Sequence, residues 1–150
     1  MLFYIIVSVI VIIIKNEGRE ERMPAIKYSR QRESIKKYLA STKEHPTADT
    51  VYTQVKKEFP NISLGTVYRN LNLLTELGEA LKISTPDGGD RFDGVTTPHC
   101  HFFCKECGSV LDIDMPESSY INEMAGKTFE GQIESHSIMF FGKCEKCLKK

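Results

Sequence analysis

Apolar residues between positions 29 and 77 recur every three or four residues in three segments, which is the spacing of amphipathic helices. The first predicted helix begins after Ser29, a good capping residue, and runs to about residue 40. The second begins after Thr47 or Asp49 and is stopped by residues 60–61, and the third runs from Leu64 to about Leu77. The positions expected to face a core are Ile35, Tyr38, Leu39, Val51, Val55, Phe59, Val67, Leu71, Leu74 and Leu77.

After Gly78 the pattern changes to that of a β-hairpin. A short apolar stretch over 80–83, a turn over 86–89 and the triplet Arg91–Asp93 indicate two short strands. Three helices followed by a hairpin predict a winged helix-turn-helix domain, with the third helix in the DNA major groove and the hairpin beside the backbone. Another small helical bundle would show the same periodicity.

The C-terminal half is patterned as a mixture of strands and one helix. Strands are predicted over 101–104, 109–115 and 132–142, with a helix from about Ser118 to Lys127. The predicted fold class is therefore α+β, an N-terminal winged helix-turn-helix domain followed by a C-terminal α/β domain. We expect the first domain over residues 23–84, a linker over 85–97 and the second domain over 98–150.

Residues 1–22 form a segment of different character. The apolar run over 2–14 is too short for a membrane-spanning helix and lacks the basic start and cleavage site of a signal peptide. Residues 17–22 can be encoded entirely by purine codons and directly precede Met23, as a ribosome-binding tract would. We expect Met23 to be the natural start, residues 1–22 to be a mis-annotated extension, and the protein to be cytoplasmic. The alternative is a short membrane anchor that tethers a regulator.

Charge is unevenly distributed although the net charge is zero. Residues 23–84 carry ten Lys or Arg against six Asp or Glu, a balance of +4, whereas residues 85–150 carry seven against eleven, a balance of −4. A basic half joined to an acidic half rich in Cys and His indicates a polyanion-binding module joined to a cation-binding module.

Two Cys-x-x-Cys pairs, Cys104/Cys107 and Cys144/Cys147, carry the strongest chemical signal. Four thiolates on two such turns match the closed tetrahedral coordination of structural Zn²⁺. Two disulfides are the alternative, but the chain has no credible secretory signal, which favours metal. Because 36 residues lie between the pairs, the zinc is expected to join two elements of an α/β domain.

A second group of metal-ligand residues begins at His99 and His101. In an extended segment these two histidines face one side while Cys100 and Cys104 face the other, so the histidines are expected to form a separate site. The nearest carboxylates are Asp93 and either Asp112 or Asp114. Mixed His/Asp ligands suit Fe²⁺, Mn²⁺ or Zn²⁺. Surface histidines without a metal would show the same spacing.

Taken together, these motifs resemble the ferric uptake regulator family from Lys27 to the C-terminus. The resemblance rests on His45-Pro-Thr-Ala-Asp, Ser63-Leu-Gly-Thr-Val-Tyr-Arg-Asn-Leu71, Arg91-Phe-Asp93, His99-x-His101 and both Cys pairs. It implies a homodimer that binds double-stranded DNA, dimerises through the C-terminal domain and uses no organic cofactor. It assigns the structural zinc to Cys104, Cys107, Cys144 and Cys147. It assigns a regulatory Fe²⁺ or Mn²⁺ to His45, Asp93, His99, His101 and Asp112.

The details are most similar to the peroxide-responsive repressor branch, which has Asp at position 93. Iron-uptake repressors typically have Glu one position earlier, where this chain has Phe92. In the peroxide-responsive branch, iron-catalysed oxidation of one histidine, here His45 or His99, releases the metal and the DNA. The additional site of many iron-uptake repressors is incomplete: His136 is present, but Pro98, Cys100 and Ser119 occupy the other positions.

Because the other positions of that additional site hold different residues, we expect His136 to be a histidine within a strand rather than a ligand. Cys100 is expected to be a small buried residue, or else a thiol near one of the sites. In the predicted recognition helix, Arg69 suits guanine or phosphate, Asn70 suits adenine, and Tyr68 suits a thymine methyl or phosphate. The expected DNA-contacting residues are Ser63, Thr66, Tyr68, Arg69, Asn70, Lys27, Arg30 and Arg32, the last three at phosphates, so that salt should weaken binding.

We therefore predict a metal-dependent, peroxide-responsive repressor that is not an enzyme. An iron- or zinc-responsive repressor of metal uptake in the same family is the alternative. A zinc-dependent hydrolase would require an open metal position and a general base, and the chain has no His-Glu-x-x-His motif to supply them.

Overall fold

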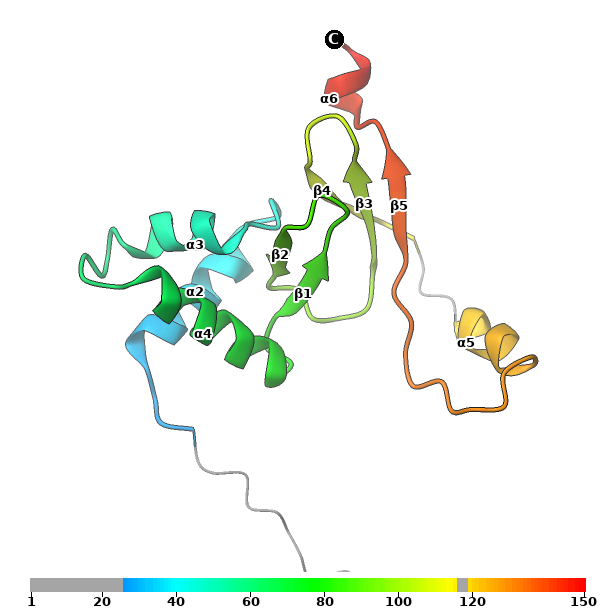
Figure 1. Ribbon diagram of the computed structural model, residues 1–150, viewed down its shortest axis with the longest axis horizontal. Helices are drawn as coiled ribbons and strands as arrows, with labels where there is room; N and C mark the ends of the chain where they lie inside the picture. The colour runs from blue at the N-terminus through cyan, green and yellow to red at the C-terminus, as the bar shows by residue number, and fades with distance from the viewer. Residues whose placement is uncertain (1–25, 116–118) are drawn as a thin grey trace, which may run out of the picture.

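The computed structural model describes residues 26–115 and 119–150 and shows helices on one side of a hairpin and a sheet on the other (Figure 1). The expectations for residues 1–22, and the predicted helix start at Ser118, lie outside the described residues. We call residues 26–76, with helices α2–α4, the helical half; residues 81–93, with strands β1 and β2, the hairpin; and residues 98–150 the sheet half.

The helical half consists of α2 (Arg30–Ser41), α3 (Ala48–Val55) and α4 (Leu64–Glu76). Each helix begins at a predicted capping side chain, because the hydroxyls of Ser29, Thr47 and Ser63 accept hydrogen bonds from backbone N–H groups of the first turn. Thr47, rather than Asp49, caps α3. Gly78 ends α4 with a φ of 68°, a left-handed conformation that favours glycine.

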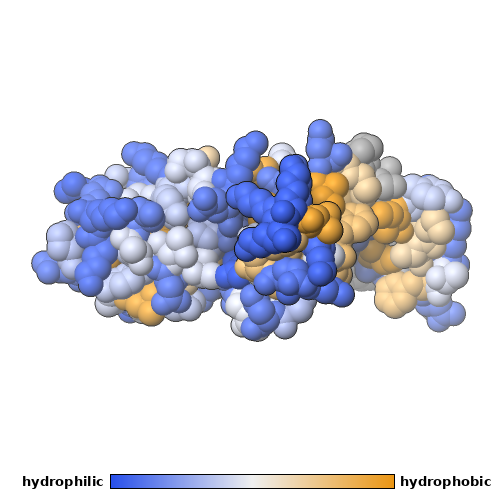
Figure 2. All heavy atoms as spheres, turned by 90° about the horizontal axis from the view of Figure 1, so that it is seen from above, coloured by the Kyte–Doolittle hydropathy of each residue, from blue (hydrophilic) through white to orange (hydrophobic). Residues whose placement is uncertain are grey.

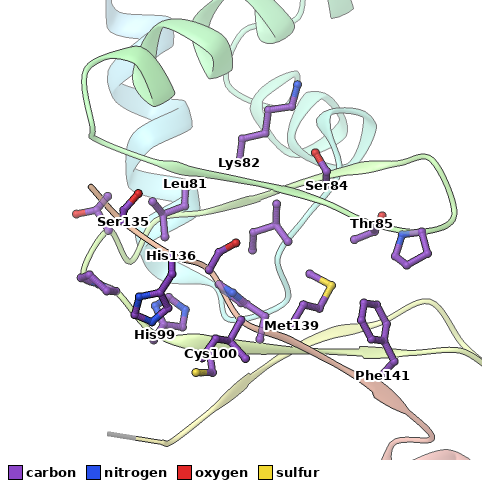
Figure 3. Close-up of a pocket in the computed structure, with 17 residues that line it drawn as sticks. Leu81, Lys82, Ser84, Thr85, His99, Cys100, Ser135, His136, Met139 and Phe141 are labelled. Carbon is purple, nitrogen blue, oxygen red and sulfur yellow. The ribbon is translucent and has the colours of Figure 1, made fainter. Parts of the chain in front are cut away.

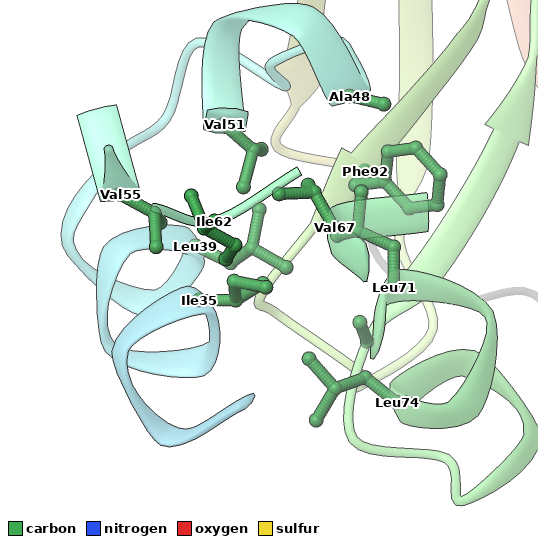
Figure 4. Packing of buried hydrophobic residues seen from close by; sticks show 11 residues of the cluster. Ile35, Leu39, Ala48, Val51, Val55, Ile62, Val67, Leu71, Leu74 and Phe92 are labelled. Atoms are coloured by element: carbon green, nitrogen blue, oxygen red, sulfur yellow. The ribbon is translucent and has the colours of Figure 1, made fainter. Parts of the chain in front are cut away.

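Nine of the ten predicted core positions meet in one apolar cluster between the three helices (Figure 4), whereas Leu77 is half-buried and lies outside it. The helix predicted up to Pro60 ends instead at Val55, and the chain then turns so that Phe59 still packs against the cluster. Phe92 contributes to the same core although it lies in the hairpin. The hairpin is therefore anchored to the helices by an aromatic side chain.

The hairpin pairs β1 (Leu81–Ser84) with β2 (Asp90–Asp93) in antiparallel register, with Ile83 opposite Arg91 and Lys82 opposite Phe92. Because side chains alternate along a strand, Phe92 faces the helices while Ile83, Arg91 and Asp93 share the opposite face. Ile83 packs there against Phe103 and Val110 of the sheet half. The hairpin thus contacts both halves of the molecule.

The sheet half has a three-stranded sheet in the order β4-β3-β5. It consists of β3 (Cys100–Cys104), antiparallel β4 (Val110–Ile113) and parallel β5 (Met139–Gly142), with α5 (Ser119–Gly126) and the short helix α6 (Glu145–Leu148) after β4 and β5. The α plus β content agrees with the predicted class.

The strand predicted over 132–142 is wrong in its first seven residues, because β5 begins only at Met139. Met139 pairs with His101, the second residue of β3, and the Ile138 carbonyl still accepts the His101 N–H, so residues 132–137 have no part of β3 beside them. Along the described residues, we find no helix long and apolar enough to span a membrane.

Candidate metal centres

His45 lies between α2 and α3 in an unusual backbone conformation. Its φ is 47°, the one positive value at a non-glycine residue among those described. Left-handed conformations of such residues are strained, by roughly 1–2 kcal/mol, and persist where the surrounding structure enforces them. The carbonyl of the next residue, Pro46, accepts a hydrogen bond of 3.0 Å from the Phe92 N–H. This bond holds the loop of His45 against the end of β2, beside Asp93.

Asp93 ends β2 and is positioned by its two following residues. The Val95 N–H donates to Asp93 Oδ1 at 2.8 Å, which leaves Oδ2 directed toward the histidines. Gly94 lies so close to the end of α2 that a Cβ atom would come within 2.6 Å of the Leu39 carbonyl carbon. Only glycine therefore allows β2 to end at this distance from the helix.

The remaining members of this cluster come from the sheet half. His101 and Asp112 are register partners on β3 and β4. The Nδ1 atom of His99 lies 2.8 Å from the Thr97 carbonyl, so that a proton on Nδ1 leaves the Nε2 lone pair free to bind a cation.

Five side chains converge at this point: His45, Asp93, His99, His101 and Asp112, with one ligand atom of each within 4.8 Å of all the others. Asp93 Oδ2 lies 3.5 Å from the Nε2 atom of His45, 3.0 Å from that of His99 and 3.5 Å from that of His101. Asp112 Oδ1 lies 2.8, 3.2 and 3.9 Å from the same three atoms. We call these residues the His/Asp site.

The buried polar atoms of the His/Asp site fit a cation. His45 Nε2, Asp93 Oδ2 and His101 Nε2 are buried without a partner of hydrogen-bond geometry, although they face one another closely. Buried polar atoms in proteins normally have partners, and three nitrogens with two carboxylate oxygens form a donor set for Fe²⁺, Mn²⁺ or Zn²⁺. A divalent ion at their common centre would satisfy all three atoms.

The same crowding shifts the pKa values of the site. Burial lowers the pKa of His45, but the adjacent Asp93 carboxylate and the charge of Asp112 outweigh it, so the pKa is raised above its ordinary value. Burial raises the pKa of Asp93, but His101, His45 and the Val95 N–H together hold it far below its usual range. The Asp93 carboxyl therefore keeps its negative charge.

The four cysteines of the Cys-x-x-Cys pairs form the second cluster, with one sulfur of each within 4.8 Å of the others. The Cys107 and Cys144 sulfurs lie 3.8 Å apart, much longer than a disulfide bond, and all five cysteines are free thiols. We call this cluster the Cys₄ site, and residues 104–109 at its first pair the first knuckle. Gly108 turns the first knuckle with a φ of 69°.

The thiol pKa values of the Cys₄ site are shifted in opposite directions. The Cys144 N–H donates to the Cys104 sulfur at 3.3 Å and, with N–H groups of its own turn, lowers the pKa of Cys104 to about 6. The neighbouring Cys144 sulfur and burial raise the pKa of Cys147 to about 12. The four sulfurs therefore disfavour one another's ionisation, and a cation bound between them would relieve this repulsion. Zn²⁺ fits this donor set.

A cavity of about 790 Å³ lies between the hairpin and the sheet half, beside the His/Asp site (Figure 3). His99 and His101 line it, together with Lys82 of β1 and Met139 of β5. The cavity gives His99 an opening, whereas the side chain of His45 is 1% exposed.

Three residues that the sequence offers as possible ligands lie in neither cluster: Asp114, Cys100 and His136. Cys100 is buried on β3, as expected for a small apolar residue, and its sulfur is directed away from the cavity (Figure 3). His136 does not lie in the expected strand, because it precedes β5, and its Nδ1 lies 2.7 Å from Asn122 Oδ1.

The predicted DNA-contacting residues lie on and before the helices, and several are engaged within their own segment. Ser63 caps α4, the Arg69 guanidinium donates to Thr66 Oγ1 at 3.0 Å, and Asn70 donates to the Thr66 carbonyl. Tyr68 is exposed, as are Lys27 and Arg30 before and at the start of α2. Arg32 is half-buried and donates to the Lys27 carbonyl at 2.7 Å.

The supports of the His/Asp site were not foreseen from the sequence. The Pro46 and Thr97 carbonyls and the Val95 N–H act through the backbone, which any residue type supplies. Gly94, directly after Asp93, was the one available signal, since glycine is typical of close backbone approach.

A family model described as the ferric uptake regulator family matches residues 24–141. Among curated proteins, the peroxide-responsive repressor PerR of Staphylococcus aureus (strain Mu50 / ATCC 700699) is 33% identical over 129 residues, which cover 86% of this chain and 87% of that protein.

Solved structures show the same fold. The peroxide stress regulator of Campylobacter jejuni is 32% identical with a TM-score of 0.69, covering 78% of this chain and 88% of that one. The ferric uptake regulator of Vibrio cholerae is 26% identical with a TM-score of 0.62, covering 79% and 92%. That of Helicobacter pylori has a TM-score of 0.71 at 24% identity, covering 100% and 95%.

Proposed function

The chain belongs to the ferric uptake regulator family, and from this premise we propose that it is a metal-dependent transcriptional repressor that senses peroxide. It would act in the cytoplasm as a homodimer on double-stranded operator DNA, without catalytic turnover. The relatives described above are regulators by name, and two of them are named for their response to peroxide.

The observation that supports this proposal most strongly is that the five residues of the His/Asp site come from different parts of the fold. His45 comes from the helical half, Asp93 from the hairpin, and His99, His101 and Asp112 from the sheet half. An ion bound to all five would hold the two halves at one angle. Because a dimer reads two half-sites at a spacing fixed by the DNA repeat, one such angle favours operator binding.

In this proposal the helical half and β1 form the winged helix-turn-helix domain over residues 23–84, and the linker over residues 85–97 supplies β2, the second strand of the hairpin. Ser63, Thr66, Tyr68, Arg69 and Asn70 would present α4 to the major groove, with Tyr68 and Arg69 exposed for this role. Lys27, Arg30 and Arg32 would meet phosphates. Since phosphate contacts release counterions, affinity should fall steeply with salt.

Residues 98–150 would form the dimerisation domain. Figure 2 shows apolar side chains gathered toward one end of the molecule, while the other end is largely hydrophilic. Large exposed apolar side chains of this half include Tyr120, Met124, Phe129, Phe140 and Phe141. A second copy of the chain would cover them, and the Zn²⁺ of the Cys₄ site would keep the domain in shape.

The peroxide response would belong to the His/Asp site, because it has nitrogen and oxygen donors only and binds its ion exchangeably. Fe²⁺ held by these residues would supply one electron to peroxide, so that its O–O bond breaks and an oxidant forms beside the ligand imidazoles. Oxidation of His45 or His99 then removes a ligand, so that the two halves separate and DNA is released. His99 lines the cavity of about 790 Å³, which gives a small oxidant a route to the site.

Operator binding with Fe²⁺ or Mn²⁺, each with and without peroxide, tests the proposal. DNA fragments can be selected from a genomic library with the Mn²⁺-loaded protein and then used in binding assays. We expect peroxide to abolish binding in the Fe²⁺ sample only, with a mass increase of one oxygen on a peptide that contains His45 or His99.

Two other outcomes would change the assignment. Binding that survives peroxide with both metals would refute peroxide sensing and favour the iron- or zinc-responsive uptake repressor. Binding that needs no metal at the His/Asp site would refute metal dependence itself.

A further inference from the structure

Arg91 is a half-buried cation that the proposed function does not use. It follows the turn of the hairpin, and its register partner is Ile83, whose side chain packs into the sheet half. Arg91 shares this face of β2 with Asp93, two residues later, at a separation of about 7 Å along the strand. The face of the hairpin that meets the sheet half therefore carries two charged groups of opposite sign.

The Arg91 guanidinium contacts the first knuckle of the Cys₄ site. Its Nη2 donates to the Gly108 carbonyl at 3.1 Å and lies 3.3 Å from Asp87 Oδ2, and the side chain is 18% exposed. Gly108 directly follows Cys107, and its N–H donates to the Cys104 carbonyl at 2.9 Å. The carbonyl that receives Arg91 is thus placed by the fold of the first knuckle.

Asp87 completes the connection from the hairpin side. Its Oδ1 accepts the Gly89 N–H at 3.1 Å and the Thr85 hydroxyl, and both residues belong to the turn between β1 and β2. Its second oxygen, Oδ2, is the one that faces Arg91. One carboxylate therefore shapes the turn with one oxygen and orients the guanidinium with the other.

We propose that Arg91 is a positioning residue that fastens the hairpin to the first knuckle, so that the state of the Cys₄ site governs how the hairpin meets DNA. The His/Asp site fixes β2 at Asp93, and Arg91 fixes it at a second point. Besides the packing of Ile83 against the sheet half, Arg91 thus gives β2 a second polar contact with that half, which limits rotation of the hairpin about Asp93. This inference rests on the proposed function, in which the hairpin lies beside the operator backbone.

A phosphate contact is the competing role for an arginine in such a hairpin. The geometry argues against it, because the guanidinium faces the sheet half on the side opposite Phe92 and already has two acceptors. Lys82 is opposite Phe92 in register, pairs with Asp90 at 2.8 Å, and is the more exposed cation of the hairpin.

Two conservative variants of the full chain separate positioning from charge. Arg91→Lys keeps the positive charge but ends in an ammonium on a flexible stem, without the rigid guanidinium plane that places Nη2 between the Asp87 and Gly108 oxygens. Asp87→Asn removes a negative charge but retains an oxygen for the Gly89 N–H. If charge alone mattered, R91K would bind operator normally and D87N would bind more tightly. We expect both to bind about three- to tenfold more weakly, with Lys82→Gln as the control for a lost hairpin charge.

Hydrogen exchange of the hairpin amides gives a readout that needs no DNA. In the wild type, stripping Zn²⁺ with a chelator should raise exchange at residues 85–89 while α2 amides stay protected. In R91K, exchange at residues 85–89 should already be raised about three- to tenfold, and zinc removal should add little, because coupled changes are not additive. K82Q should respond to zinc removal as the wild type does.

Several results would overturn the coupling. It is refuted if hairpin exchange in R91K equals that of the wild type with and without zinc, or if D87N binds operator more tightly. It is also refuted if the hairpin loosens while operator affinity is unchanged. A wild-type protein that binds no DNA with any metal would refute the proposed function. The exchange comparison would still decide whether Arg91 couples the hairpin to the Cys₄ site.

Discussion

His45 combines a strained backbone with the most enclosed imidazole of the His/Asp site. Its φ of 47° and its 1% exposed side chain place the ring between Asp93 and Asp112. A residue in this conformation holds its ring in place only while the Pro46–Phe92 hydrogen bond and the surrounding packing enforce it. Loss of the ion would therefore leave a strained loop that favours separation of the halves.

His45→Asn tests this residue directly. Asparagine tolerates the left-handed conformation, so the loop should fold while the imidazole ligand is lost. We expect Mn²⁺ affinity, measured by electron paramagnetic resonance titration, to fall by at least about 100-fold. His136→Asn is the matched control, since His136 lies outside the cluster, and its affinity should equal that of the wild type. Equal affinities for all three proteins would remove His45 from the site.

The raised pKa of His45 predicts how pH acts on the metal-free and metal-loaded protein. In the metal-free protein, His45 contributes stability that is complete below its unfolded pKa of about 6.5 and is lost as pH rises through its higher folded pKa. Mn²⁺ must displace that proton, so its affinity should fall about tenfold per pH unit below the folded pKa.

Asp93 works in a separate pH window. Its pKa is lowered by folding, so its contribution is present above an unfolded pKa of about 3.9 and is lost only as pH falls toward its folded pKa. Mn²⁺ titrations and thermal unfolding between about pH 5.5 and 8.5 should therefore report on His45. The difference between wild type and H45N isolates this effect from the Cys₄ site, and a pH-independent difference would contradict it.

At the scale of elements, the close approach of β2 to α2 depends on Gly94. A methyl group there would lie 2.6 Å from the Leu39 carbonyl carbon and 2.7 Å from the Ala40 nitrogen, and both are backbone atoms that cannot rotate away. The strand end that carries Asp93 would have to move.

Gly94→Ala should therefore destabilise the protein by about 1–3 kcal/mol and weaken Mn²⁺ binding, because Asp93 moves away from His45. Thermal unfolding and Mn²⁺ titration measure the two effects. Gly126→Ala at the end of α5 is the control, since no atom lies within 4 Å of its added methyl group. The contact would be unimportant if G94A unfolded with the wild-type midpoint.

Several elements could be predicted from the sequence because their signals are local. Ser29, Thr47 and Ser63 are capping residues whose partners lie three residues away, and the helical periodicity needs no distant contact. The strand over 132–138 failed for the opposite reason, because a strand requires a partner and β3 begins only at Cys100. The four residues of α6 are too few to show any periodicity.

The candidate sites also have features that the sequence predicts and features that it does not. The ligand types and spacings could be predicted, and the structure brings together all five residues of the His/Asp site and all four of the Cys₄ site. The choice of Asp112 over Asp114 came from family resemblance, since both have the same strand parity. The backbone supports of His45, Asp93 and His99 could not be predicted, because carbonyl and N–H groups leave no trace in the sequence.

At the scale of the whole molecule, the exposed apolar side chains of the sheet half contrast with the hydrophilic helical half (Figure 2). Tyr120 and Met124 lie one helical turn apart on α5, 58% and 49% exposed. A second copy that covers this face would remove both from water.

The double variant Tyr120→Ser/Met124→Ser should shift the proposed dimer toward monomer, with a dissociation constant at least about tenfold higher, because apolar area that would drive association is lost. Sedimentation equilibrium measures this change. Ile26→Ser, which removes an exposed apolar side chain from the other half, should leave the dimer intact. An unchanged dimer in the double variant would place the interface elsewhere.

The alternation along β2 also limits how the two halves can diverge in evolution. Phe92 must suit the helical core, while Arg91 and Asp93 must suit the sheet half, and the three are consecutive in the chain. A chimaera that takes its sheet half from a relative should fold and respond only if the donor residues facing Ile83 and Arg91 match this hairpin. The molecule is thus less modular than its order of elements implies, because neither half can be exchanged without regard to the hairpin between them.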